Sequence, residues 1–134
     1  MRYSQFRDWL VERLPSRYEG LEFYPGPDLP SDTPNRFVLL SKTGGPGLDA
    51  EGLIDVRGWQ VRCAGSQNDY DDAERLAETL DAIILNFNQS QQVGDTWLVS
   101  IYRTGGEPTQ LTVDNADRTH FVASYLASVQ SALV

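Results

Sequence analysis

The sequence has few of the residues that enzyme and metal sites require. Its 134 residues include a single cysteine, Cys63, and a single histidine, His120. One cysteine excludes an internal disulfide and a cysteine-based zinc cluster, and one histidine cannot supply a two-histidine metal centre. Ser-His-Asp catalysis would depend on His120 alone, and the sequence has no Gly-x-Ser-x-Gly nucleophile elbow. We therefore expect no enzyme activity, no cofactor and no metal site.

Clustered positive charge and long apolar runs are also missing. The net charge is −8, from 11 basic and 19 acidic residues, and the basic residues are scattered along the chain. Binding to a nucleic-acid backbone relies on concentrated positive charge, so we expect no sequence-specific nucleic-acid partner. No apolar run approaches the roughly 18 residues of a membrane span, and the first residues are too polar for a secretory leader. These absences favour a cytosolic protein without a membrane partner.

Two amphipathic helices are predicted. Apolar residues recur at helical spacing from Tyr3 to Leu14, and Pro15 ends that pattern. The stronger pattern runs from Asp69 to Phe87, where Asn68 or Asp69 can cap the first turn. The predicted outer face of this helix carries the charged residues Asp71, Glu74, Arg75, Glu78 and Asp81.

The remaining periodic segments predict strands. They are the apolar run from Phe37 to Ser41, the alternating segments from Asp55 to Ala64 and from Asp95 to Thr104, and the last segment from Arg118 to Val129. In the second of these, Trp59, Val61 and Cys63 form the face expected to point inward. The last segment favours a strand, with a helix as the alternative. We predict one α+β domain over residues 1–134, with a mainly antiparallel sheet of about four strands, one long helix packed across it and an N-terminal helix.

Three segments are predicted to be irregular. The glycine-rich segment from Thr43 to Gly52 is too long for a tight hairpin turn and is expected to form a mobile flap between two strands. It lacks the lysine and the Ser/Thr of a phosphate-binding loop. A second flexible turn is expected from Gly105 to Pro108. The proline-rich segment from Glu19 to Pro34 is expected to be extended and mostly exposed, with its start held to the core as a short edge strand.

Short motifs along most of the chain match a known pattern. They are the strand end Thr43-Gly44-Gly45, the strand Gly58-Trp59-Gln60-Val61-Arg62-Cys63, the helical Ala73-Glu74-Arg75-Leu76-Ala77 and the later Gly106-Glu107-Pro108. In this order they resemble the tail terminator (minor tail, or tail completion) proteins of long-tailed bacteriophages. The similarity covers roughly residues 1–130. The loop after Gly45 is longer here than in many relatives.

The resemblance implies a structural protein of the virion that is assembled in the host bacterial cytoplasm. Such subunits close into a ring, usually a hexamer, on the head-proximal end of the finished tail tube. The ring stops tail polymerisation and offers a surface for head joining. The implied partners are therefore copies of the chain itself, the major tail tube protein and a head-completion or connector protein.

A ring needs two subunit surfaces that match head to tail. We expect them to include the glycine-rich flap and the second turn, because irregular exposed segments often carry contacts. The outer face of the long helix is expected to pair with arginines of a neighbour. The predicted interface residues are Thr43, Gly44, Gly45, Pro46, Gly47, Glu74, Glu78, Gly105, Gly106 and Glu107.

Two other functions are compatible with the sequence. One is a head–tail connector or stopper subunit, which would bind on the portal side and not on the tail tube. The other is a small-ligand or nucleotide-binding enzyme, which would need a deep polar pocket around His120 or around the glycine-rich segment.

Overall fold

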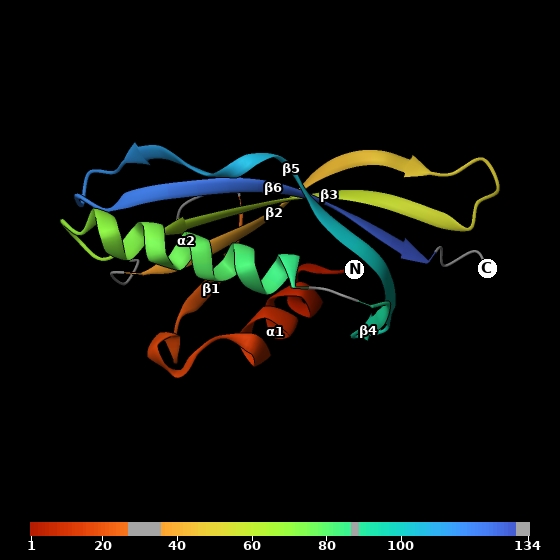
Figure 1. The fold of residues 1–134 in the computed structure, drawn as a ribbon, viewed down its shortest axis with the longest axis horizontal. Helices are drawn as coiled ribbons and strands as arrows, with labels where there is room; N and C mark the ends of the chain where they lie inside the picture. Colours follow the sequence, from red (N-terminus) through yellow and green to blue (C-terminus); the bar gives the residue numbers. More distant parts are fainter. Residues whose placement is uncertain (27–35, 87–88, 131–134) are drawn as a thin grey trace.

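The computed structural model of the chain describes residues 1–26, 36–86 and 89–130. The elements are α1 (Tyr3–Arg13), a 3-10 turn η1 (Ser16–Tyr18), β1 (Glu22–Pro25), β2 (Phe37–Leu48), β3 (Ile54–Ala64), α2 (Tyr70–Leu85), β4 (Gln91–Val93), β5 (Thr96–Val113) and β6 (Thr119–Gln130). Both helices lie on one face of a single sheet (Figure 1). Neither helix in this part of the chain is long and apolar enough to span a membrane.

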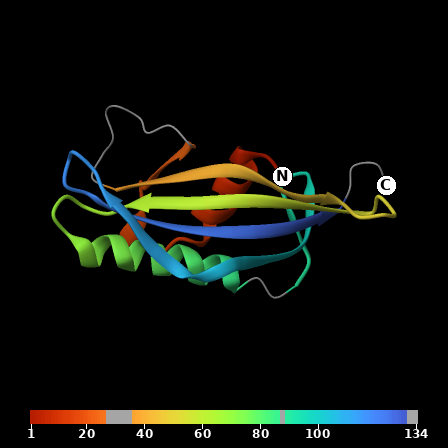
Figure 2. The ribbon, with the colours of Figure 1, turned by 90° about the horizontal axis from the view of Figure 1, so that it is seen from above.

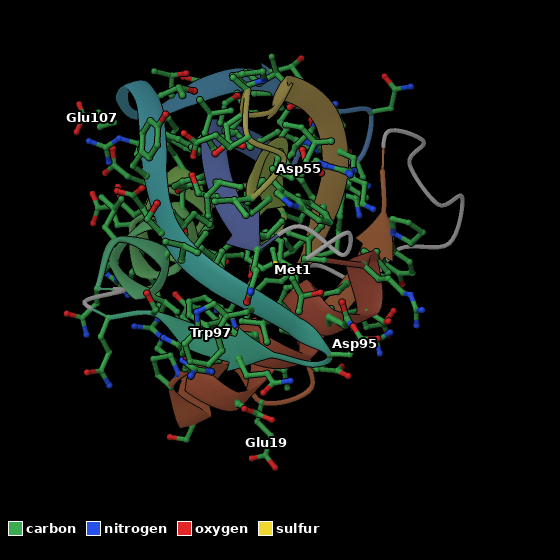
Figure 3. The ribbon with its side chains drawn as sticks, turned by 90° about the vertical axis from the view of Figure 1, so that its right-hand side faces the viewer. Met1, Glu19, Asp55, Asp95, Trp97 and Glu107 are labelled. Atoms are coloured by element: carbon green, nitrogen blue, oxygen red, sulfur yellow. The ribbon has the colours of Figure 1, made fainter. Side chains whose placement is uncertain are left out.

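The sheet has six strands in the order β1-β2-β3-β6-β5-β4. Strand β1 is parallel to β2, and every other neighbouring pair is antiparallel. Figure 2 shows the four long strands side by side, and the end view in Figure 3 shows that the sheet curls into a half-barrel. The prediction of a mainly antiparallel sheet of about four strands with one long helix was therefore wrong. Strands β1 and β4 are too short to leave a clear period-2 pattern in the sequence.

The glycine-rich segment is mostly strand and not a flap. Residues 43–48 belong to β2 and pair with β3, with irregular register around Gly44 and Gly47. These two glycines have φ of 82° and 84°, a conformation that costs glycine little and other residues much more. The ladder can therefore continue through two bulges. Only residues 49–53 connect the two strands, at the end of a hairpin that extends beyond the helices (Figure 1).

The second predicted turn is also part of a strand. Residues 105–108 form a bulge inside β5, between Thr104, which pairs with Ser124, and Thr109, which pairs with Val122. The strand then continues to Val113. The chain reverses at residues 114–118, and the last element is strand β6, so the strand interpretation of this segment is confirmed.

The main core lies between the helices and the concave face of the sheet. The predicted inward face of β3 is confirmed, because Trp59, Val61 and Cys63 are all buried. The apolar stripe of α2 packs against it, and the Asp69 side chain caps that helix by accepting a hydrogen bond from the Asp72 backbone at 3.0 Å. The expected end of this helix at Phe87, like the second half of the proline-rich segment, lies outside the described residues. β1 is the short edge strand expected at the start of that segment.

Candidate assembly interface

Both edges of the sheet are partly open among the described residues. Strand β1 pairs with β2 only along Phe37–Leu40 and Gly26 lies against Ser41, so among the described residues no strand pairs with residues 42–48 on that side. At the other edge, β4 pairs with β5 only at residues 96–98 and the Val99 carbonyl accepts a hydrogen bond from the Ser90 hydroxyl at 3.3 Å, so among the described residues no strand pairs with residues 100–113 on that side. An uncovered strand presents backbone N–H and C=O groups that can pair with another chain. The described part of the fold therefore has two separate open edges, one on each side of the sheet.

The predicted interface residues of the two glycine-rich segments lie on these two edges. Residues 43–46 are exposed and Gly47 is half-buried, all in the open stretch of β2. Gly105, Gly106 and Glu107 are exposed in the β5 bulge, where Figure 3 shows Glu107 at the periphery. One subunit does not bring the two groups together, because β3 and β6 separate the edges. Their role as interface residues stays a prediction.

The acidic face of α2 is narrower than the sequence predicted. Glu78 is exposed and Glu74 is half-buried, but Asp81 is buried against the sheet. Its carboxylate accepts a hydrogen bond from the Tyr125 hydroxyl at 2.7 Å and pairs with the Arg103 guanidinium. Asp81 therefore anchors α2 to β5 and β6 and is not available to a neighbour.

His120 has a structural place in the fold. Its side chain is fully buried, its Nδ1 accepts a hydrogen bond from Arg62 Nε at 3.0 Å, and its Nε2 lies 2.8 Å from Asp114 Oδ2. Because arginine only donates, the ring is the neutral tautomer with its proton on Nε2. A histidine without solvent access and with both nitrogens engaged cannot serve as a general base for an external substrate.

Three further features bear on the chemistry that the sequence left open. Burial raises the pKa of the Cys63 thiol to about 12, so it is not a thiolate at neutral pH. An open cavity of about 400 Å³ is lined by Arg17, Tyr18, Glu19, Gly20, Leu21, Arg36 and Ser66, and it includes neither His120 nor the glycine-rich segment. Among the described residues, no group of three or more His, Cys, Asp or Glu side chains is placed to hold a metal.

Comparison with known families identifies the chain. Residues 27–131 match the family model described as bacteriophage tail terminator protein. The chain belongs to this family. The matched region contains β2 to β6 and α2, and therefore both open edges, whereas α1 and β1 precede it. Comparison with curated proteins finds no match. The family resemblance seen in the sequence motifs is thus confirmed, and the tail terminator family is structural and not enzymatic.

The sequence did not reveal the apolar side chains that this tail terminator exposes along β5. Trp97 and Tyr102 are 43% and 49% exposed, and Leu111 and Val113 are also exposed. Tyr102 lies in the open stretch of β5, where a half-exposed aromatic residue is a typical anchor of protein interfaces, whereas Trp97 lies beside β4. Alternation alone could not show this, because the register of β5 shifts between Leu98 and Ser100, so Leu98 and Ile101 are both buried.

Acid is expected to destabilise this tail terminator in two stages. Burial lowers the pKa of His120 below its ordinary value of 6.5. Hydrogen bonds from Arg36 lower the pKa of Asp72 to about 2. Burial alone would raise the pKa of Asp114, but hydrogen bonds, first from His120, outweigh it and lower that pKa to about 2.

Below about pH 6.5 the unfolded chain takes up a proton that folded His120 resists. Below about pH 4 the two carboxylates lose stability worth about 2 kcal/mol each.

The measurement is urea unfolding at a series of pH values from 8 down to about 2. The His120→Asn variant is expected to lose the first stage and to keep the Asp72 part of the second, whereas the Asp114 part shrinks because His120 no longer donates to that carboxylate. A free energy of unfolding that stays constant between pH 7 and pH 3 would contradict the ion pairs and hydrogen bonds described above.

Proposed function

We propose that this tail terminator works as a closed ring of copies on the head-proximal end of the tail tube. There it ends polymerisation of the tube and offers the surface to which the head is joined. In this proposal the ring is a hexamer, and its partners are the major tail tube protein on one side and a head-completion or connector protein on the other. The protein then remains in the finished virion.

The observation that supports a ring best is the pair of open edges. The two edges belong to different strands on opposite sides of the domain. A contact between two different surfaces is heterologous, and repeating it generates either a ring or an open filament. The curled sheet supports the ring, because a curved subunit turns each copy relative to the last (Figure 3).

The proposal is tested with tail tubes assembled from the cognate tube protein. Addition of the full chain is expected to stop tube growth and to leave a ring at one end of each tube in negative-stain electron microscopy. Native mass spectrometry of the ring then gives its copy number, for which we expect six. Tubes that keep growing at saturating protein would refute the proposal. Binding to the portal assembly without binding to tubes would identify a head–tail connector instead.

The acidic residues of α2 provide a variant for the same assay. Glu74→Lys with Glu78→Lys is expected to raise the concentration needed for capping roughly fivefold, as for the loss of about 1 kcal/mol of exposed ion pairing. The matched control is Asp8→Lys with Glu12→Lys, which reverses two exposed charges at the same spacing on α1. Equal effects of the two double variants would assign the loss to net charge and not to this face.

A further inference from the structure

We infer that neighbouring copies join edge to edge, with residues 100–104 of β5 in one copy adding as an antiparallel partner to residues 42–47 of β2 in the next copy. The inference rests on the proposed ring. It adds which surfaces meet, in which direction and at which level of the sheet. The result is a single sheet that continues through the ring.

The first argument is that both open stretches lie at the same level along the strands. The register across the sheet places Ser41 level with Gln60, Ser124 and Thr104, and Gly47 level with Val56, Ser128 and Ser100. A closed ring has no rise from one copy to the next. In a ring whose axis runs along the strands, surfaces that meet must therefore lie at one level. The two open stretches satisfy this condition.

The second argument is the direction of the strands. The pairs β2–β3, β3–β6 and β6–β5 are all antiparallel, so β5 runs opposite to β2. Rotation about an axis along the strands does not change their direction. The β5 edge of one copy therefore meets the β2 edge of the next in antiparallel orientation, which is slightly more stable per residue than a parallel pair.

The third argument is that the short outer strands leave the same part of both edges unpaired. We call this part the window; it comprises residues 42–47 of β2 and residues 100–104 of β5. The pairing of β1 with β2 ends at Leu40, which is level with Val61 and Ala123. Ala123 lies opposite the bulge at residues 105–108, so β5 leaves its regular path at the level where β1 of the neighbour ends. At the other end, the pairing of β5 with β4 ends at Leu98 of β5, which is level with Leu48, the last residue of β2. Neither outer strand competes for the window.

The side chains in the window are also complementary. Tyr102 is level with Leu126, Gly58 and Gly44, and antiparallel residues at one level share a face of the sheet. A neighbour's Tyr102 would therefore face Gly44, whose Cβ position is open, whereas the Cβ position of Gly58 is already filled by the Gly44 carbonyl and the Thr43 hydroxyl. A cross-strand aromatic side chain compensates for glycine in this position. The half-exposed Tyr102 thus has a place in the next copy.

Disulfide cross-linking tests the pairing. Within one copy, positions 41 and 104 are three strand spacings apart, about 14 Å, and a disulfide needs Cα atoms closer than about 7 Å. Every disulfide in a Ser41→Cys, Thr104→Cys variant must therefore join two copies, and buried Cys63 does not compete. On capped tubes, oxidation is expected to give a ladder of covalent multimers that ends at the copy number of the ring.

The matched control is Ser41→Cys with Thr112→Cys, which uses the same edges at different levels, since Thr112 is level with Phe37 under β1. It is expected to give no ladder. Disulfide dimers from Thr104→Cys alone would show two β5 edges meeting and would overturn the inference. Rings that cap tubes while the Ser41→Cys, Thr104→Cys variant stays monomeric under oxidation would also overturn it and leave the proposed function intact. Absence of rings would refute the proposed function itself.

A second readout uses the aromatic side chain. Tyr102→Ala is expected to raise the concentration needed for ring formation by at least roughly thirtyfold, the effect of losing a buried interface anchor. Its control is Trp97→Ala, which removes another exposed aromatic residue of β5 that lies beside β4 and outside the window. Both variants are expected to unfold like the original chain. Equal assembly by Tyr102→Ala and the original chain would contradict the predicted contact with Gly44.

Discussion

Replacement of Trp59 by alanine is expected to lower the free energy of unfolding by about 4 kcal/mol. Trp59 is 1% exposed, and its ring packs edge-on against Phe6 of α1, with centroids 4.9 Å apart. It therefore joins the centre of the sheet to the N-terminal helix. Its removal leaves a cavity that strands held on both sides cannot close. Because typical domains have 5–15 kcal/mol of stability, this is the largest effect we expect from one substitution.

Urea unfolding followed by circular dichroism measures the loss, and the thermal midpoint should fall by more than about 10 °C. The matched control is Trp97→Ala, which removes the same side chain from a position that is 43% exposed. It is expected to change the free energy of unfolding by no more than about 0.5 kcal/mol. Similar losses for the two tryptophan variants would mean that the core does not depend on Trp59 as described.

Asp81→Ala is expected to have the second-largest effect, a loss of about 3 kcal/mol. The substitution leaves the Tyr125 hydroxyl buried without its 2.7 Å partner and removes the carboxylate that pairs with Arg103. Arg103 Nε already has no hydrogen-bond partner among the described residues. An unpaired, largely buried guanidinium next to α2 is costly, because its charge has been removed from water. The loss is measured by urea unfolding.

Two variants separate the parts of this cluster. Tyr125→Phe removes only the hydroxyl group and is expected to cost about 1 kcal/mol. Glu78→Ala removes an exposed carboxylate from the same helix and is expected to change stability by less than about 0.5 kcal/mol. If Asp81→Ala costs no more than Tyr125→Phe, the pairing with Arg103 contributes nothing to stability.

The elements that could be predicted from the sequence are those with a complete local pattern. Apolar residues that recur every 3.6 residues predicted α1 and α2, with bounds that differ from the observed ones by at most two residues. Alternation identified the inward face of β3 and favoured a strand for β6. These signals need no knowledge of distant residues, since burial of one face is reflected directly in the spacing of apolar side chains.

The features that the sequence did not predict depend on pairing between distant segments. Gly44 and Gly105 have positive φ, which is typical of turns and also of bulges within a strand. Only the ladders to β3 and β6 show that both glycine-rich segments continue their strands. Asp81 fits the charged side of α2 in a helical projection, but the curled sheet brings Tyr125 and Arg103 to it.

The sequence by itself determined that this chain has two amphipathic helices, a sheet with a buried apolar face and the motifs of the phage tail terminator family. Only the tertiary structure decided which strands stand at the edges, how far β1 and β4 cover them and that the two open stretches share one level. The reason is that apolar spacing is a local property. An open edge is instead the absence of a partner strand and emerges only when every other strand has been paired.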